Sequence, residues 1–440
     1  MRRAEIKILQ LNTKDIGGGA EKVAWNLFQT YREYGHESWL AVGKKYSDDI
    51  KVFQIDPTDG KSFRSRLDRN INALLGRENF SFPATWRLLN RAPVYPSILQ
   101  AHNLHGGYFD LRALPWLSQQ VPLILTLHDS WLLSGHCAYS MACDRWKTGC
   151  GHCPDLSLYP SLLRDSTAFN WWRKQKIYKK MRLYISTPSH WLMRQVKESI
   201  LSQAAIESRV IPNGVDLSVF CPGSQEAARA SLNIPKESFV LLFASSGAFK
   251  NMYKDYATLR EAAIRATKTL VNRPIILIVV GENAAPEKIG NLEIRFVPYQ
   301  RKQEVLASYY QAADLYTHAT NAESWGLAIT EASACGIPVV ATRTGGIPEQ
   351  IKNLFEHTIE DSNGILVEIK NAQAMARAIV KLLENESLRR RLGENAREGA
   401  ERKFSLEIQA RTYLDWYQEI LARQTSKVST SSFSEAGVRE

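Results

Sequence analysis

Two glutamates stand near each other in a stretch of the chain that carries almost no other charge. Residues 321–346 read NAESWGLAITEASACGIPVVATRTGG, with Glu323 and Glu331 on either side of a Trp-Gly pair. The run LAITEASAC has the composition of a helix that is covered on most sides, and IPVVAT reads as a buried strand. Burying an unpaired carboxylate costs several kcal/mol or forces it to take up a proton. The sequence therefore predicts either a salt bridge or a polar ligand at this position.

Two explanations for the carboxylates remain open at this point. Arg343, at the end of the next predicted strand, is a candidate ion-pair partner for Glu331. Gly326, in contrast, stands where the helix should begin, so the unpaired N–H groups of the first turn form a site for an anion such as phosphate. In that arrangement Glu323 and Glu331 would accept hydrogen bonds from sugar hydroxyls on either side of the phosphate.

A glycine-rich turn lies between the first predicted strand and the first predicted helix. The segment KILQLNTKDIGGGAEKVAWNLF places Gly17, Gly18 and Gly19 in a tight loop, a backbone shape that lets a phosphate or a sugar approach closely. Such a turn also occurs without any ligand. The glycine spacing differs from the dinucleotide-binding fingerprint, which argues against an NAD-dependent enzyme.

A second loop of this kind is found in VLLFASSGAFKNMYKDYATL. Gly247 ends a predicted strand, and Lys250 and Lys254 precede a predicted helix. Lysines in such a loop are often only solvated. In a binding cleft they would instead neutralise a diphosphate through charge-assisted contacts.

Four of the six cysteines fall in one short segment, GHCAYSMACDRWKTGCGHCP, with the spacing C-x5-C-x6-C-x2-C. His136 and His152 stand beside them. In a chain predicted to be cytosolic, this clustering favours a structural zinc site over disulfides, although packed free thiols remain an alternative. The candidate ligands are Cys137, Cys143, Cys150 and Cys153.

The length and the order of predicted elements place these residues in an α/β protein. A chain of 440 residues with 44% hydrophobic content is long enough for two domains. Strands such as IKILQLN, PLILTLH and PIILIVVG alternate with helical patterns, which is typical of parallel, doubly wound sheets. The sequence has no apolar run long enough to span a membrane and no apolar signal-peptide core, so we expect a soluble, cytoplasmic protein.

Several motifs, in this order, resemble those of one enzyme family. They are GGGAEKV, LHDSW, STPSHWL, VIPNGVDLSVFCP, the strand that ends in a glycine followed by lysines, and AESWGLAITEASACGIPVVAT. With them the chain resembles the retaining GT-B glycosyltransferases of family 4 over residues 5–420. The resemblance implies two Rossmann-like, doubly wound α/β domains facing across a cleft, with a nucleotide sugar held mainly by the second domain and the acceptor by the first.

The resemblance also implies domain boundaries. An acceptor-binding domain would span residues 1–215, with the cysteine-rich insertion at 136–154, and a nucleotide-sugar-binding domain would span residues 216–405. A helix at 406–425 would return to the first domain. The polar tail at 426–440 is predicted to be disordered.

Individual residues receive roles from the same resemblance. Glu331 would bind the ribose hydroxyls of the nucleotide, and Glu323 would bind a hydroxyl of the donor sugar. Lys254 would bind the diphosphate, with Lys250 in place of the family's usual arginine, as a point charge without the guanidinium fork. His128 would contact the sugar near the reacting carbon. The alternative for this histidine is a structural one, in which Asp129 satisfies it.

The implied catalytic residues are thus His128, Glu323 and Lys254. The remaining implied donor contacts are Gly18, Gly19 and Gly247 in the two glycine loops, the backbone N–H groups of Trp325, Gly326 and Leu327 at the phosphate, and Val297 and Tyr299 near the base.

The implied chemistry requires charge stabilisation more than a covalent nucleophile. Transfer with retention develops an oxocarbenium-like sugar and a departing diphosphate, so the enzyme must stabilise charge on the leaving group. In a retaining glycosidase, a carboxylate beside the anomeric carbon is the nucleophile. The family is thought instead to let the leaving phosphate take the acceptor's proton on the same face of the sugar, with no cofactor or divalent metal required.

Positive charge is concentrated in the first half of the chain. Residues 1–215 contain 29 Lys and Arg against 18 Asp and Glu, whereas residues 216–440 contain 27 of each. Residues 164–184, RDSTAFNWWRKQKIYKKMRLY, mix seven basic residues with aromatics. This composition suits peripheral contact with an anionic membrane, or merely a solvated helix face. No nucleic-acid-binding motif accompanies it, which argues against nucleic acid as a partner.

The favoured function is a transferase that moves a sugar from a nucleotide sugar to a glycan or lipid-linked acceptor, in the biosynthesis of a cell-surface polysaccharide. The alternatives are a nucleotide-sugar epimerase or a sugar phosphorylase on the same scaffold, or a catalytically silent protein that binds a sugar nucleotide. A silent relative would be expected to lose Glu323 or Lys254, and both are present.

Overall fold

The computed structural model describes residues 4–58 and 63–435, and the chain divides into two compact units. The first contains residues up to Thr187, residues 193–211 and the chain from Glu407 onward, and the second contains residues 188–192 and 212–406. The change of unit after Ile211 lies close to the boundary at residue 215 that the family resemblance implies.

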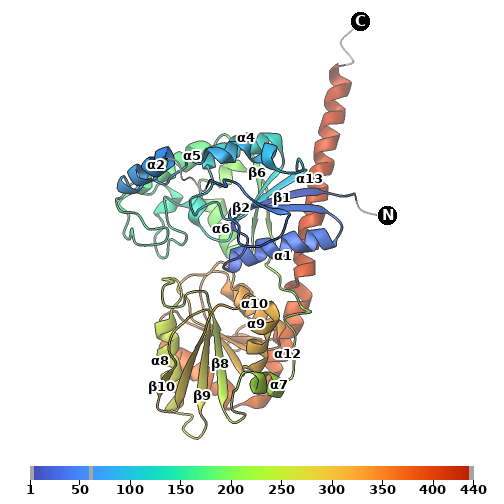
Figure 1. Ribbon diagram of the computed structural model, residues 1–440. Coiled ribbons are helices and arrows are strands. Elements are labelled where there is room, and N and C mark those ends of the chain that lie inside the picture. The colour runs from blue at the N-terminus through green and yellow to red at the C-terminus, as the bar shows by residue number, and fades with distance from the viewer. Residues whose placement is uncertain (1–3, 59–62, 436–440) are drawn as a thin grey trace. The chain divides into compact units, whose positions relative to one another are not determined.

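The first unit is built on a seven-stranded parallel sheet of order β3-β2-β1-β4-β5-β6-β7 (Figure 1). Its strands are β1 (Lys7–Lys14), β2 (Glu37–Lys44), β3 (Val52–Gln54), β4 (Ile98–Ala101), β5 (Leu123–Thr126), β6 (Leu183–Thr187) and β7 (Ala205–Val210). Its helices are α1 (Gly19–Glu33), α2 (Phe63–Leu74), α3 (Leu88–Arg91), α4 (Leu114–Gln120), α5 (Thr167–Tyr178), α6 (His190–Glu198), whose first residues are grouped with the second unit, and α13 (Leu406–Glu435).

Polar side chains buried in the centre of this sheet bind the last helix of the chain. Gln100 on β4 is fully buried and accepts a hydrogen bond from the Tyr417 hydroxyl of α13 at 2.7 Å. Tyr413, one turn earlier, donates to Ser186 of β6 at 3.0 Å. Helix α13 therefore completes the core of the first unit, to which the chain from Glu407 onward belongs.

Helix α13 also extends further than expected. It continues to Glu435, so the disorder predicted for residues 426–435 is wrong, while residues 436–440 lie outside the described residues. The polar composition suggested disorder, but the sequence from Leu406 to Glu435 contains no glycine or proline that would end a helix.

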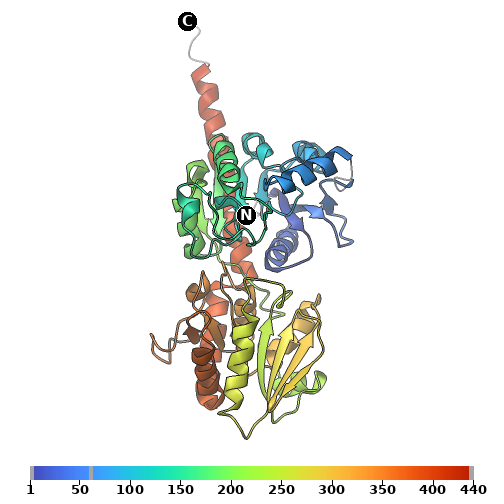
Figure 2. The same cartoon turned by 90° about the vertical axis from the view of Figure 1, so that its left-hand side faces the viewer.

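The second unit is built on another sheet, whose strands run from yellow-green to brown in Figure 2. The sheet has seven strands in the order β10-β11-β9-β8-β12-β13-β14, and in it only β10 is antiparallel to its neighbour. Its strands are β8 (Phe239–Ala244), β9 (Ile275–Val280), β10 (Glu287–Ile289), β11 (Leu292–Val297), β12 (Leu315–His318), β13 (Val339–Thr342) and β14 (Gly364–Val367). Its helices are α7 (Gln225–Ser231), α8 (Tyr256–Thr267), α9 (Gln303–Ala312), α10 (Leu327–Ala334), α11 (Ala372–Leu383) and α12 (Glu386–Lys403).

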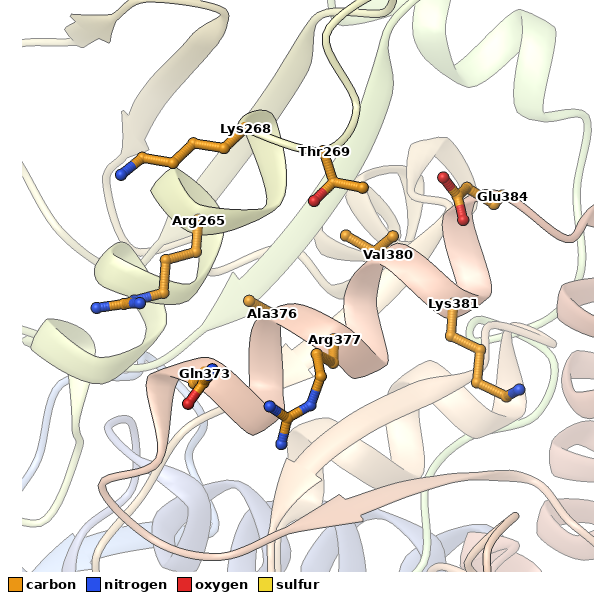
Figure 3. Close-up of a pocket in the computed structure, with 9 residues that line it drawn as sticks. All are labelled: Arg265, Lys268, Thr269, Gln373, Ala376, Arg377, Val380, Lys381 and Glu384. Atoms are coloured by element: carbon orange, nitrogen blue, oxygen red, sulfur yellow. The ribbon is translucent and has the colours of Figure 1, made fainter.

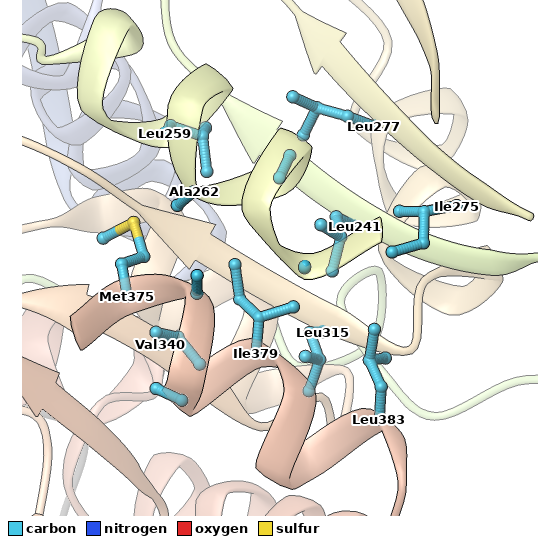
Figure 4. Packing of buried hydrophobic residues seen from close by; sticks show 14 of the residues in the cluster. Leu241, Leu259, Ala262, Ile275, Leu277, Leu315, Val340, Met375, Ile379 and Leu383 are labelled. Carbon is cyan, nitrogen blue, oxygen red and sulfur yellow. The ribbon is translucent and has the colours of Figure 1, made fainter. Parts of the chain in front are cut away.

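The core of the second unit lies between one face of the sheet and helices α8 and α11. Leu259 of α8 and Ile379 of α11 are fully buried against strand residues such as Leu241 and Leu315 (Figure 4). The strands carry almost continuous apolar runs because helices cover both faces of a parallel sheet. The doubly wound α/β class predicted from the sequence is confirmed in both units.

Each sheet reverses its strand order at one point, and ligands of such folds bind beyond the carboxyl ends of the strands there. In the first unit the reversal lies between β1 and β4, and in the second between β8 and β12. The glycine-rich loop at residues 15–18 follows β1, and Lys254 and Glu323 follow β8 and β12. The fold therefore places this loop, Lys254 and Glu323 at the two reversal points, whereas His128 follows β5 and Val297 ends β11.

The basic-aromatic segment at residues 164–184 is arranged differently from the expected membrane contact. Trp171 donates its indole N–H to the Trp146 carbonyl oxygen, and Tyr178 donates its hydroxyl to that of Leu132, both at 2.8 Å. Lys174 is fully buried. Trp171, Lys174 and Tyr178 share the buried face of α5, so the prediction that these three side chains contact lipid is wrong. The prediction considered only the residue types. The spacing of three and four residues between Trp171, Lys174 and Tyr178 places their side chains on one face of the helix. Other members of the segment are exposed, and their contact with a membrane stays a prediction; they are Trp172, Lys176, Lys179 and Lys180. No helix in the described ranges is long and apolar enough to cross a bilayer.

Candidate functional site

The centre of the candidate site in the second unit is an ion pair between Lys254 and Glu323. Lys254 Nζ lies 2.5 Å from Glu323 Oε2, and the two side chains are only 14% and 15% exposed. His318 Nε2 lies 3.5 Å from the same carboxylate oxygen. Two residues separated by 69 positions in sequence are thus brought together, as the sequence interpretation of this site requires.

Backbone pairing between the segments after β8 and β12 holds Lys254 in place. Lys254 forms an antiparallel bridge with Thr320. The Thr320 hydroxyl and the Asn321 N–H both donate to the Tyr253 carbonyl oxygen at 2.7 Å. Main-chain contacts therefore fix the backbone of Lys254, whatever conformation its side chain adopts.

Glycines after β13 support the backbone of Glu323 from the other side. The Gly346 N–H donates to the Glu323 carbonyl oxygen at 3.0 Å. Gly345 has φ +57°, and a Cβ atom at this residue would lie 1.7 Å from that same oxygen. Only glycine allows both the left-handed conformation and the close approach. The TGG turn is thus a structural requirement of the site.

The surroundings of Glu323 keep its carboxyl group ionised. Burial by itself raises the pKa, but the positive charge of Lys254 and the contact with His318 outweigh it and lower the pKa to about 2. For His318, burial and then the Lys254 charge lower the pKa, against the opposing effect of Glu323. The site therefore presents a carboxylate and an ammonium group side by side.

Glu331 lies on α10 and is 4% exposed. Its Oε2 accepts a hydrogen bond from the Tyr310 hydroxyl of α9 at 2.8 Å. Arg343, the ion-pair partner considered from the sequence, contacts Glu356 and lies 3.8 Å from Glu368 instead. Arg343 is therefore paired with other carboxylates, and the binding of ligand hydroxyls by Glu331 stays a prediction.

The beginning of α10 is closed in part by Gln350. The Gln350 side chain accepts from the Gly326 N–H at 3.1 Å and donates to the Gly326 carbonyl oxygen at 3.0 Å. Three consecutive N–H groups were expected to bind a phosphate. Because Gln350 occupies that of Gly326, those of Trp325 and Leu327 remain as the candidates. The sequence offered no signal for this glutamine, which lies after a different strand.

The other predicted donor contacts lie in neighbouring loops of the same unit. Gly247, with φ +68°, donates its N–H to the Gly281 carbonyl oxygen at 3.0 Å. Lys250 is exposed and does not join the Lys254–Glu323 pair. The Val297 carbonyl oxygen already accepts hydrogen bonds from two N–H groups, so a nucleotide base would contact the Val297 side chain instead. The Tyr299 side chain is 45% exposed.

In the first unit, His128 belongs to a chain of hydrogen bonds that the sequence did not indicate. Its Nε2 lies 3.0 Å from His102 Nδ1, and His102 Nε2 lies 2.8 Å from Gln10 Oε1. Since an amide oxygen only accepts, His102 Nε2 carries a proton, His102 Nδ1 accepts from His128, and the lone pair of His128 lies on Nδ1. Burial lowers the pKa of His128 to about 4, so its imidazole is neutral at pH 7.

Asp129, proposed from the sequence as the structural partner of His128, binds another histidine. His105 Nε2 lies 2.9 Å from Asp129 Oδ2. The carboxylate outweighs burial and raises the pKa of His105, while the pKa of Asp129 is lowered despite burial. His128 is therefore oriented by His102 and not by Asp129.

The glycine-rich loop before α1 faces a carboxylate. A Cβ atom on Gly17 would lie 3.1 Å from the Glu21 carboxyl carbon, and one on Gly18 would lie 3.4 Å from Glu21 Oε2. Gly19 has no atom within 4 Å of such a position. The negative charge makes this loop a poor site for a phosphate and a better one for hydroxyl groups.

The cysteine-rich segment is folded without a preformed metal site. All six cysteines are free, and within residues 4–58 and 63–435 no group of three or more His, Cys, Asp or Glu side chains is arranged to hold a metal ion. The Gly135 N–H donates to Cys150 Sγ at 3.2 Å, and Cys153 Sγ lies 3.4 Å from His136 Nε2. Burial raises the pKa of Cys150 to about 12. Zinc binding at these cysteines therefore stays a prediction.

A groove elsewhere on the second unit does not include any of the predicted site residues. It lies between the second half of α8 and helix α11, and four of its side chains are cationic (Figure 3). These are Arg265, Lys268, Arg377 and Lys381. Lys254 lies just before the first turn of α8, whereas the groove is lined by residues in and after the last turn of that helix. The groove is therefore separate from the candidate site.

The chain matches two family models that lie end to end. Residues 17–219 match the model described as Glycosyltransferase Family 4, and residues 224–399 match that of Glycosyl transferases group 1. Among curated relatives, a D-inositol 3-phosphate glycosyltransferase of Saccharomonospora viridis is 33% identical over 49% of this chain and 50% of the relative. A putative colanic acid biosynthesis glycosyl transferase of Escherichia coli is 24% identical over 85% and 92%. The chain spans about half the length of the first of these relatives.

Solved structures show the same fold at lower identity. Sucrose-phosphate synthase from Thermosynechococcus elongatus has a TM-score of 0.66 at 19% identity and covers 95% of this chain and 100% of its own. Anabaena HepE in complex with UDP and glucose has a TM-score of 0.62 at 17% identity, over 94% and 100%. With two consecutive family models, two doubly wound units and these matches, the chain belongs to the GT-B glycosyltransferases.

Proposed function

We propose that the protein transfers a sugar, with retention of its anomeric configuration, from a nucleotide-sugar donor to a glycan or lipid-linked acceptor in cell-surface polysaccharide biosynthesis. The observation that carries the proposal is the buried Lys254–Glu323 pair at the reversal point of the second sheet. A relative named for colanic acid biosynthesis and a structural neighbour bound to UDP and glucose support the classes of pathway and donor.

The charges of the pair match the two parts of a nucleotide sugar. Glu323 is ionised because its pKa is lowered to about 2, so it accepts hydrogen bonds from sugar hydroxyls. Lys254 carries the positive charge that a diphosphate needs. Its ammonium group gains a second anionic partner when the donor binds. A third negative charge then develops on the diphosphate as the bond between the sugar and the phosphate breaks.

Glu331 recognises the nucleoside end of the donor in this proposal. Tyr310 orients the Glu331 carboxylate through a hydrogen bond, and the family resemblance assigns this carboxylate to the two adjacent hydroxyls of the ribose. The N–H groups of Trp325 and Leu327, at the start of the same helix, would bind the distal phosphate. One helix thus fixes both ends of the nucleotide.

We infer retention of the anomeric configuration from the mechanism that the family resemblance implies. We assign no carboxylate as a nucleophile, because Glu323 is committed to Lys254 and the sugar hydroxyls. The departing phosphate takes the acceptor's proton. In the first unit, neutral His128 has its lone pair on Nδ1, so it can accept a hydrogen bond from a sugar hydroxyl, which is the role that the family resemblance implies.

We also propose that the enzyme works in the cytoplasm. All six cysteines are free thiols, and free thiols persist in a reducing compartment. In this proposal the enzyme takes its nucleotide-sugar donor from the cytoplasm.

The proposal is tested by donor binding and by turnover, measured separately. A panel of nucleotide sugars is scanned for thermal stabilisation, because a ligand at 100 times its Kd stabilises the folded state by about 2.7 kcal/mol. Glu331→Ala should weaken donor binding, Lys254→Ala should abolish turnover, and Lys268→Ala, at an exposed lysine in the groove of Figure 3, is the matched control. Full transfer activity in either site variant, or no stabilisation by any nucleotide sugar, would contradict the proposal.

A further inference from the structure

Helix α2 in the first unit exposes its apolar side chains. Phe63, Leu67, Ile71 and Leu74 are 81%, 46%, 45% and 69% exposed. Their spacing of four, four and three residues places them on one face of the helix. A helix that packs on a globular core buries such a stripe, so the stripe on α2 faces away from the core.

The polar residues of α2 lie on the side that is partly covered. Arg69 and Asn72, on the face opposite to the stripe, are less exposed than any of the four apolar side chains. Asn72 donates its side-chain amide to the Asp68 carbonyl oxygen at 2.8 Å. The helix is therefore amphipathic with its polarity reversed relative to an ordinary surface helix.

The end of α2 is firmly tied to the beginning of α5, beside it in Figure 1. The Ser166 hydroxyl donates to the Leu75 carbonyl oxygen at 2.6 Å, and the Asn170 amide donates to that of Gly76 at 3.1 Å. These contacts hold α2 against the unit through its last turn. The outward position of the stripe is thus fixed by hydrogen bonds.

Two aromatic residues of α5 extend the exposed apolar surface. Phe169 and Trp172 are 38% and 44% exposed, and their rings stack with centroids 5.8 Å apart. The Arg77 guanidinium lies 4.7 Å from the Phe169 ring centroid, and Lys176 Nζ lies 3.8 Å from that of Trp172. Exposed aromatic rings paired with cations are typical of groups at the boundary between a bilayer and water.

The charge of this surface selects one kind of partner. Residues 63–77 contain four arginines and a single acid, Asp68. An apolar stripe flanked by arginines is complementary to acyl chains beneath a layer of anionic headgroups. A twelve-residue helix is about 18 Å long, so α2 would lie in the plane of the bilayer surface.

We propose that α2, together with Phe169 and Trp172, forms a surface that binds an anionic lipid bilayer. The stripe on α2 enters the boundary between headgroups and acyl chains, and the neighbouring cations contact lipid phosphates. The surface lies outside the candidate site, and binding requires neither a donor nor transfer activity.

The test is flotation of the full-length protein with phosphatidylcholine vesicles, with and without phosphatidylglycerol. Native protein should bind the anionic vesicles, and raising the salt concentration should weaken that binding. In Leu67→Ser/Ile71→Ser/Leu74→Ser the partition coefficient should fall by at least about 100-fold, since each large apolar side chain withdrawn from lipid costs on the order of tenfold. The control is Lys179→Gln/Lys180→Gln, which removes exposed charge at the far end of α5 and should bind within about threefold of native.

Circular dichroism and gel filtration establish that the triple variant is folded, which is expected because its three side chains are exposed. Failure of the native protein to float with anionic vesicles at low salt overturns the proposal. So does equal flotation of the triple variant, or a loss in the lysine control as large as that in the triple variant. A native dimer without lipid that the triple variant abolishes, combined with no flotation, would assign the stripe to a second copy of the chain.

Discussion

Replacing Lys254 with methionine should destabilise the second unit as well as stop turnover. The pKa of Glu323 is lowered from 4.5 to about 2 in the folded protein, and a difference of one in pKa corresponds to about 1.4 kcal/mol. The ionised carboxylate therefore contributes about 3 kcal/mol to the free energy of unfolding. Lys254 supplies the largest favourable part, so we expect Lys254→Met to lower that free energy by about 2 to 3 kcal/mol at pH 7.

The pH dependence gives the same prediction a second readout. A carboxyl group with a lower pKa in the folded protein than in the unfolded chain stabilises the fold above its unfolded pKa, and that stabilisation is lost as the pH falls towards the folded pKa. In the native protein the loss should occur between about pH 4.5 and pH 2. In Lys254→Met the difference between pH 7 and pH 3 should be smaller, because much of the contribution is already absent.

The assay is calorimetric unfolding of the full chain, with the transition of the second unit identified as the one that a nucleoside diphosphate shifts. Lys268→Met, at an exposed lysine, is the control and should unfold like the native protein. If Lys254→Met and the native protein have the same free energy of unfolding at pH 7 and the same dependence on pH, the electrostatic reasoning about the pair is refuted.

Three further predictions concern other parts of the chain. Gly345→Ala should destabilise the protein by at least about 2 kcal/mol more than Gly290→Ala in urea unfolding, because both glycines have a positive φ but only the first faces an oxygen at 1.7 Å; equal losses would contradict this. His102→Phe should lower turnover by about tenfold with donor affinity unchanged, because the neutral ring of His128 loses the acceptor that fixes its tautomer; an unaltered kcat would exclude that role. Purified protein should carry about one zinc per chain, and Cys150→Ser should lower both metal content and Tm; reactive thiols and no zinc under reducing conditions would end the idea.

The sequence was most informative where chemistry and backbone shape coincide. Glu323, Lys254 and Gly247 were singled out because charged residues and glycines stand out next to buried strands. Parallel strands buried on both faces gave continuous apolar runs, which made the doubly wound class predictable. In these places local composition directly reflects the structure.

The sequence was least informative where a residue's role depends on which face of a helix it occupies or on a distant partner. His318, Tyr310 and Gln350 contact the candidate site residues across different elements, and nothing in their local sequence indicates it. The spacing of Trp171 and Lys174 could have indicated a buried face, but their types suggested a lipid surface. Tertiary contacts decided these cases.

Hydrogen bonding between α13 and the first sheet has a consequence for biosynthesis. Gln100 and Tyr417 are 317 residues apart, and a ribosome adds roughly 5 to 20 residues per second. The first unit therefore waits roughly 15 to 60 s after its central strand is made before the helix that completes its core leaves the ribosome. During that interval the second unit is synthesised in full, and most of it is one continuous stretch, residues 212–406, that can already fold. The half of the protein that is made first is thus the half that must finish folding last.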